Sequence, residues 1–270
     1  MENNYIEINK KSWNNRVDTH VSSDFYDMEN FLKGKNSLKS IELGLLGDLR
    51  YKKVLHLQCH FGQDSISMAR MGAEVVGVDL SDKAIDKATE IASTMNVDAK
   101  FIQSDIYDLK NHLDEQFDIV FTSYGTIGWL PNMNRWADIV SHFLKPGGKF
   151  VFVEFHPVVW MFDDAFEKVA YNYFNSEAII EDESGTYADR SAEIQQTYMM
   201  WNHDLGEVLT ALISQGLELK QFQEFDYSPY NCFQGTEKID EDHYIIKHLG
   251  NRIPLVYALT ASKLHFSKNV

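Results

Sequence analysis

Apolar and polar positions along the chain predict strands that alternate with helices. Residues 54–57 and 73–78 are short apolar segments, which are typical of strands. Residues 64–71 can form a helix between them, and residues 84–95 carry apolar side chains at helical spacing behind Ser81, a good N-cap. These segments together predict a βαβα unit.

The alternation continues as far as residue 155. Short apolar segments at 100–103 and 117–122 predict two more strands, and a helix with Trp136 on its apolar face follows. The Lys-Pro-Gly-Gly sequence at 145–148 stops that helix. Residues 149–155 then form a continuous apolar run, which favours a parallel strand covered on both faces.

Regular patterning is lost on either side of these five strands. The first 45 residues predict one or two amphipathic helices that would form an N-terminal lid. Residues 157–203 are rich in aromatic and acidic side chains without a clear period, which predicts an inserted cap. A helix at 205–215 and strand-like segments at 217–227 and 255–262 follow.

Composition narrows the class of protein. With 270 residues, 44% of them hydrophobic, the chain can bury a large core. The 40 acidic and 25 basic residues give a net charge of -15, which disfavours binding to nucleic acid. No apolar run approaches the roughly 20 residues that span a bilayer, and the start lacks a signal-peptide core, so we expect a cytoplasmic protein. The only cysteines, Cys59 and Cys232, have no spacing that suggests a disulfide framework or a metal site.

The loops that follow the strands carry the candidate chemistry, because ligands of an open parallel sheet bind beyond the carboxyl ends of its strands. The loop at 56–65 leads into a helix whose N-terminus can receive a carboxylate or phosphate. It keeps only Gly62 of the three glycines that let a dinucleotide pyrophosphate approach, which argues against NAD. Asp79 ends the second strand, where a carboxylate can accept hydrogen bonds from both ribose hydroxyls; capping the helix beside Ser81 is the alternative.

Five segments occur in an order that resembles class I (Rossmann-like) S-adenosylmethionine (SAM)-dependent methyltransferases: VLHLQCHFGQDS, VVGVDLS, FIQSDIYDL, FDIVFTSYG and FLKPGGKFVFVEF. The LQCHFG-type first motif is similar to a small-molecule branch of that family. The resemblance is strong over 54–155 and weak over 205–262. It implies an α/β fold with a Rossmann-like, seven-stranded, mostly parallel sheet, helices on both faces and an antiparallel last strand. It also implies SAM as the cofactor and S-adenosylhomocysteine as its product.

Within this fold the chain is expected to be one domain, residues 1–270. Its parts are the N-terminal lid at 1–45, the SAM-binding core at 50–156, the inserted cap at 157–203 and the C-terminal part of the sheet at 204–270.

The resemblance assigns cofactor contacts to the strand ends. Asp79 would hold the ribose, Leu80 would flank the adenine, and Asp105 with the backbone of Ile106 would read the adenine amino edge. Asp105 lies just beyond a strand end and can face the same crevice; helix capping is its alternative role.

The first loop departs from the family pattern. The family has an acidic residue where His56 stands and glycines where Gln58 and His60 stand. Histidine tolerates a left-handed backbone better than a bulky aliphatic residue does, and Gln58 or His60 could donate to the ligand carboxylate. The alternative is that His60 merely fills space. The expected cofactor contacts are Gln58, His60, Gly62, Asp79, Leu80, Asp105, Ile106 and Ser123.

Methyl transfer is an in-line displacement, which requires the nucleophile to be held within about 3–3.5 Å of the methyl group and water to be excluded. Ser123 and Tyr124 follow the fourth strand, where this fold brings the substrate to the methyl group. His156, after the fifth strand, and His203 are candidates to take a proton, with His20 a further one. Core packing is the alternative for Tyr124, and a surface or capping role is the alternative for each histidine.

These features favour a methyltransferase that acts on a small-molecule acceptor, without nucleic-acid or membrane partners, as a monomer or homodimer. Two other classes stay open: a regulatory protein that binds SAM without turnover, and an NAD-dependent oxidoreductase. Several aromatic side chains could wall an acceptor pocket, and packing within a lid explains them equally well. They are Trp13, Tyr124, Trp129, Trp160, Tyr198 and Trp201.

Overall fold

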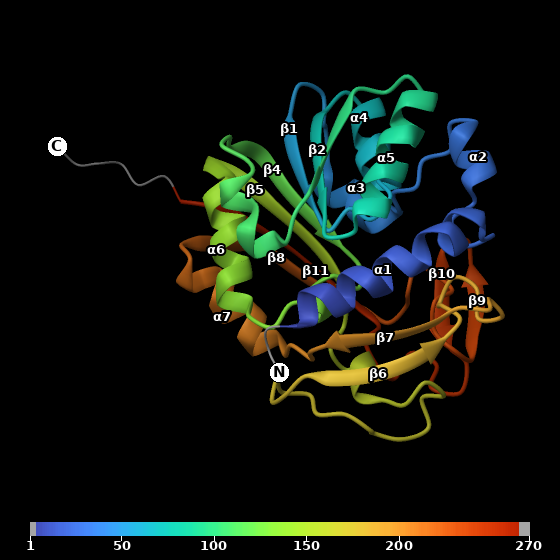
Figure 1. Ribbon diagram of the computed structural model, residues 1–270. Helices are drawn as coiled ribbons and strands as arrows, with labels where there is room; N and C mark the ends of the chain where they lie inside the picture. The colour runs from blue at the N-terminus through green and yellow to red at the C-terminus, as the bar shows by residue number, and fades with distance from the viewer. Residues whose placement is uncertain (1–3, 265–270) are drawn as a thin grey trace.

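A seven-stranded sheet in the order β3-β2-β1-β4-β5-β11-β8 forms the centre of the computed structural model, which describes residues 4–264 (Figure 1). β11 pairs antiparallel with both β5 and β8, and the pairs among β1 to β5 are parallel. This topology confirms the predicted fold class. The strands are β1 (Lys53–Leu57), β2 (Glu74–Asp79), β3 (Ala99–Gln103), β4 (Phe117–Ser123), β5 (Leu144–Phe155), β8 (Leu217–Phe225) and β11 (Val256–Lys263).

Helices cover both faces of the sheet. α6 and α7 pack on one face, where Trp136 is fully buried and its ring lies 5.2 Å from that of Phe152. α3 and α4 pack on the opposite face, around Leu45 and Met68. The helices are α1 (Tyr5–Ser22), α2 (Met28–Leu32), α3 (Ser40–Leu46), α4 (Gln63–Arg70), α5 (Asp82–Thr94), α6 (Met133–Phe143) and α7 (Leu205–Ser214).

The predicted strands and helices of the core are present, with one difference at β5. This strand begins at Leu144 rather than at Lys149. Leu144 pairs with Phe117, and the register then shifts before Lys149 pairs with Ile119. The Pro146-Gly-Gly sequence therefore lies within β5 as an irregularity instead of separating α6 from the strand.

Two hairpins that the pattern of apolar residues did not predict lie outside the central sheet. β6 (Ile179–Ser184) and β7 (Gln195–Met200) pair antiparallel within the inserted cap, and β9 (Thr236–Asp240) pairs with β10 (His243–Ile246) in the long loop before β11. β6 is mostly polar, and much of the support for its partner β7 comes from α1, which lies along it (Figure 1). The side chain of Asn9 both donates to and accepts from the backbone of Met199, at 2.8 and 2.9 Å, much as a neighbouring strand would.

The lid also differs in detail from the expectation, because it contains three helices rather than one or two. α1 crosses near the carboxyl ends of the strands (Figure 1), and α3 packs on the face of the sheet that α4 also covers. Over residues 4–264, no helix combines the length and apolar character that crossing a bilayer would require.

Candidate active site

A cavity of about 460 Å³ lies beyond the carboxyl ends of β1 to β5, between the sheet and the segments that cover it. Its lining includes every residue predicted to contact the cofactor, together with Tyr124 and His203. The six aromatic residues singled out in the sequence line it as well. The third predicted catalytic residue, His156, lies outside the lining.

The loop after β1 adopts alternating left-handed positions. Gln58, His60 and Gly62 have φ values of +56°, +50° and +79°. At Gly62 a Cβ would come within 2.7 Å of the Phe101 ring and 2.9 Å of Ala88, so both the backbone conformation and the available space require glycine there. The loop is therefore folded like a glycine-rich loop although two of its left-handed positions carry long side chains.

Those two side chains present unpaired polar atoms. Gln58 donates its amide to the Thr126 carbonyl at 2.7 Å, and its Oε1 is buried with no partner among residues 4–264. His60 Nδ1 is likewise buried and unpaired within the described chain. An unpaired buried polar atom costs about 1–3 kcal/mol, so both atoms point to a polar ligand. Gln58 Oε1 can therefore accept a hydrogen bond, for example from an ammonium, and the bond to Thr126 uses only one of the two N–H groups of the amide.

His60 faces a second imidazole on the lid. His20 Nδ1 lies 2.9 Å from His60 Nε2, and burial lowers the pKa of both groups, that of His20 to about 3. Arg16 lowers both pKa values further through its charge. The pair is therefore neutral at physiological pH, with one proton shared between the facing nitrogens.

Asp79 joins the first two loops of the sheet. Its Oδ2 accepts the backbone N–H of His60 at 2.8 Å, and its Oδ1 accepts that of Ser81 at 2.9 Å. Burial raises the pKa of Asp79 to about 6, and these N–H groups oppose the rise. A carboxylate has about four lone-pair sites, so both oxygens can still accept from hydroxyls in the cavity. Ser81 itself caps α5, accepting from Ala84 at 3.0 Å, so the capping role predicted as an alternative belongs mainly to Ser81.

Asp105 lies two residues beyond the end of β3. One of its oxygens accepts the backbone N–H of Tyr107 at 3.1 Å and so caps a short 3-10 helix, Ile106–Asn111. Burial raises the pKa of Asp105. The residue also lines the cavity beside Leu80 and Ile106, so the capping role and a ligand role are compatible.

His56 is a buried neutral group, at a position where the methyltransferase family that this chain resembles has an acidic residue. Its Nδ1 lies 2.8 Å from Ser65 Oγ, and burial lowers its pKa to about 3. Its chemistry is thus that of an uncharged hydrogen-bonding ring, unlike a carboxylate at this position.

Ser123 ends β4 and Tyr124 follows it, and both residues line the cavity. The Tyr124 hydroxyl donates to Oε2 of Glu42, on α3, at 2.8 Å. Glu42 is fully buried, and burial with the nearby charge of Asp64 raises its pKa to about 7. Nothing in the sequence marks Glu42, because an acidic residue in a short amphipathic helix is most often exposed.

Glu154 is a second buried carboxylate that was not predicted. It is 2% exposed and accepts the backbone N–H groups of Gly125, Thr126 and Ile127. It therefore fixes the loop that follows Tyr124. Its one sequence signal is an acidic residue within the apolar run of β5.

Two predicted proton acceptors are not placed for that task. His156 is turned toward β8, where its Nε2 lies 2.9 Å from Glu224, and its Nδ1 accepts the backbone N–H of Val158. His203 lines the cavity, but its Nε2 donates to the Leu130 carbonyl at 2.7 Å and its Nδ1 lies 2.9 Å from Glu207. Neither ring has a nitrogen free to take a proton from a substrate.

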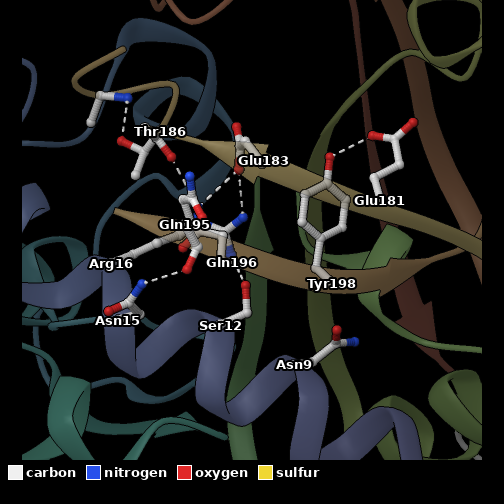
Figure 2. Close-up of polar contacts among 12 residues, drawn as sticks. Asn9, Ser12, Asn15, Arg16, Glu181, Glu183, Thr186, Gln195, Gln196 and Tyr198 are labelled. Atoms are coloured by element: carbon white, nitrogen blue, oxygen red, sulfur yellow. Dashed lines mark hydrogen bonds and ion pairs between the residues drawn. The ribbon is translucent and has the colours of Figure 1, made fainter. Parts of the chain in front are cut away.

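Polar side chains connect α1 to the β6–β7 hairpin at the cavity. Figure 2 shows Arg16 reaching from α1 to Glu183 of β6, at 2.8 Å. The Arg16 guanidinium also lies 5.1–5.4 Å from the ring centres of three aromatic residues. These rings are Trp13, Trp129 and Tyr198. Cation–π contacts of this kind are worth about 0.5–2 kcal/mol each, so Arg16 is a central tie between the lid and the cap.

Known methyltransferases are similar to this chain in sequence. The family model described as "Methyltransferase domain" matches residues 50–246. An uncharacterized methyltransferase of Synechocystis is 37% identical over 114 residues, and the ubiquinone biosynthesis O-methyltransferase of Salmonella arizonae is 27% identical over 136 residues. The matches cover 41% and 49% of this chain and 51% and 56% of those proteins, so the chain spans about half the length of these curated relatives.

Solved structures agree in fold. A crystal structure of an S-adenosylmethionine-dependent methyltransferase from Clostridium acetobutylicum has a TM-score of 0.57 at 14% sequence identity, covering 95% of this chain and 98% of that one. At this identity the similarity establishes the fold. Because the family model matches well over half of the sequence, the chain belongs to the methyltransferase domain family.

Proposed function

We propose that the cavity binds SAM and that the chain transfers its methyl group to a small-molecule acceptor. The observation that carries this proposal is the pair of partly buried carboxylates, Asp79 and Asp105, at the ends of neighbouring strands. They flank an apolar edge of the cavity formed by Leu80 and Ile106. An adenosine needs a hydrogen-bond acceptor for its ribose hydroxyls, which Asp79 supplies, and one for its amino group, which Asp105 supplies. Its base needs an apolar slot, which Leu80 and Ile106 supply.

The loop after β1 supplies complementary groups for the methionine end. The unpaired Oε1 of Gln58 is suited to the ammonium. His60 Nδ1 has no partner among residues 4–264, and as a neutral imidazole it can donate to the carboxylate if it carries the ring proton. Bound SAM would supply an electrophilic methyl group, and Ser123 and Tyr124 line the part of the cavity that an acceptor would enter.

A small acceptor is favoured by the way the site is covered. Aromatic side chains from the lid, the inserted cap and the loop before β9 all line the cavity, which excludes water from the reacting atoms. The net charge of -15 disfavours a polyanionic substrate such as nucleic acid. The O-methyltransferase of ubiquinone biosynthesis, a relative by sequence, acts in the synthesis of a small molecule.

Calorimetry with SAM and S-adenosylhomocysteine, together with a methyl-release assay over a panel of hydroxyl, amine and thiol metabolites, tests the proposal. We expect both adenosyl compounds to bind and at least one acceptor class to be methylated. Binding without turnover over the whole panel would favour a regulatory SAM-binding protein. Binding of NAD in place of SAM would overturn the assignment of the cavity.

A further inference from the structure

On the acceptor side of the cavity, Tyr124 connects the lining to a carboxylate behind it. Tyr124 faces the cavity from the end of β4, whereas Glu42 is fully buried on α3 and lies outside the lining. The hydroxyl of Tyr124 donates to Glu42 Oε2 at 2.8 Å. The Tyr124 hydroxyl is therefore a direct hydrogen-bonded link between the cavity lining and Glu42.

The direction of this hydrogen bond restricts what Tyr124 can do toward the cavity. A phenol has a single proton, and Tyr124 gives it to the carboxylate. Its oxygen can therefore only accept from a molecule in the cavity. This arrangement is complementary to an acceptor whose nucleophilic atom still carries a proton. A nucleophile without a proton could form no hydrogen bond with the Tyr124 oxygen.

Glu42 is suited to receive a proton. Its Oε1 accepts the backbone N–H of Lys39 at 2.6 Å, and no side-chain cation among residues 4–264 forms a salt bridge with it. The Lys39 ammonium pairs instead with Asp242 at 2.7 Å. Burial, with the charge of Asp64, raises the pKa of Glu42 to about 7, so both protonation states are accessible near neutral pH. The titratable groups around it are Lys39 on its own helix, Asp64 from α4, Tyr124 after β4, and Tyr227, Tyr230 and Asp242 from the segment between β8 and β11.

The surroundings of Tyr124 are aromatic. The rings of Tyr230 and Phe155 lie 5.1 and 5.6 Å from it, and Phe155 in turn packs against Phe233 at 5.0 Å and Trp160 at 5.9 Å. All of these side chains line the cavity. Edge-to-face and offset contacts with such rings favour a flat, apolar ligand.

We propose that the acceptor is an aromatic hydroxyl compound, and that Glu42 receives its proton through Tyr124. The proposal rests on the methyl-transfer function proposed above. In the step, the acceptor oxygen forms the C–O bond as the S–CH3 bond breaks. Its proton passes to Tyr124 Oη while the proton of Tyr124 passes to Glu42, so the products are the methyl ether, S-adenosylhomocysteine and a protonated Glu42.

The relay requires the two protons to move together. Burial and the charge of Glu42 raise the pKa of Tyr124 well above its usual range, so Tyr124 does not persist as a tyrosinate and gives its proton to Glu42 as it receives one from the acceptor. Tyr124 would be the catalytic residue that contacts the acceptor. Glu42 acts through it, positioning the tyrosine proton and then holding it.

Steady-state methylation of catechol tests the relay in wild type, Glu42→Gln, Tyr124→Phe and the double variant. Glu237→Gln, on the exposed strand β9, serves as the control. We expect each single variant to lower kcat about 100-fold with KM and SAM affinity changed less than about twofold. The double variant should be no slower than either single variant, because the two residues act as one unit. Wild-type kcat should fall as pH drops through an inflection near 7, and Glu42→Gln should lack that inflection.

Several outcomes would overturn the relay. An unchanged kcat in Glu42→Gln would do so, as would single-variant losses that multiply in the double variant. An inflection near pH 7 that persists in Glu42→Gln would reduce Glu42 to a structural role. Methylation of aniline but not of catechol by the wild type would exclude a hydroxyl acceptor while leaving the proposed methyl transfer intact. Failure to bind SAM, measured by calorimetry on the same samples, would instead refute the proposed function itself.

Discussion

The two sides of the cavity are built in different ways. On the cofactor side, the loops after β1, β2 and β3 are short, and hydrogen bonds to backbone N–H groups hold their carboxylates; Asp79 and Asp105 are the examples. On the acceptor side, segments far apart in sequence meet through side chains. Tyr124 bonds to Glu42, 82 positions away, and Arg16 bonds to Glu183, 167 positions away.

This difference separates what the fold fixes from what the individual protein can vary. Backbone donors keep their positions as long as the sheet is intact, so the cofactor side tolerates changes elsewhere. A side-chain pair is lost when either partner changes, so the acceptor side can be altered by one substitution. We infer that the cofactor site is a rigid part of the framework and that acceptor choice resides in the long-range pairs.

The largest expected effect tests the rigidity of the cofactor side. Gly62→Ala should lower the free energy of unfolding by about 3 kcal/mol, because the left-handed backbone and the contacts with Phe101 and Ala88 both oppose a Cβ. Gly235→Ala is the matched control, since Gly235 has a φ of +66° but nothing within 4 Å of the point where a Cβ would lie, and should cost about 1 kcal/mol. Urea unfolding measures both. Equal losses in the two variants would mean that the loop after β1 can rearrange to accept a Cβ, and the cofactor side would then not be rigid.

The second effect concerns the cofactor side alone. Asp79→Ala should weaken SAM affinity by about 2–3 kcal/mol, or roughly 30- to 150-fold, because ribose hydroxyls would lose a charged acceptor. Tyr124→Phe, on the acceptor side, should leave SAM affinity within about twofold of wild type. Calorimetry with SAM measures both variants, with circular dichroism as the check on folding. Similar losses in both would show that the two sides are not separable.

The sequence predicted the sheet and the ends of its strands well, but it did not predict the side-chain pairs Tyr124–Glu42 and Arg16–Glu183. The reason is that the former depend on local sequence and the latter on distant segments. Val54, Val75 and Ile119 belong to short apolar segments whose partners are determined by the regular alternation of strands and helices. Asp79 and Asp105 could be recognised because Asp79 ends β2 and Asp105 lies two residues beyond the end of β3. The position of a residue relative to its own strand is local information.

Glu42 and Arg16 carry no such local mark. Both lie on helices of the lid, and their burial depends on segments that the pattern could not place. The β6–β7 hairpin was missed for the same reason, because its polar strands depend on contacts with α1. His156 and His203 were named because they lie on loops expected to face the site. The partners of their ring nitrogens were not predicted: Glu224 on β8 for His156, and Glu207 with the Leu130 carbonyl for His203.

The smallest effect compares buried histidines from the two sides. His56 belongs to β1 and His20 to the lid, and burial lowers the pKa of each to about 3. Because the folded pKa lies below the unfolded value near 6.5, the unfolded state binds more protons at acid pH. The stability contributed by each neutral ring is therefore complete above pH 6.5 and is lost as the pH falls toward 3.

Urea unfolding of wild type and His56→Asn at pH 7.5 and 5.0 measures this linkage. The wild type should lose about 2 kcal/mol relative to the variant over that range, since each pH unit below 6.5 is worth about 1.4 kcal/mol for one proton. The corresponding difference for His20→Asn should be smaller, because α1 can release His20 to water by local opening, which costs less than global unfolding. If His20 shows the full 2 kcal/mol, the lid is bound as tightly as the sheet, and the contrast between a rigid cofactor side and an adaptable acceptor side no longer holds.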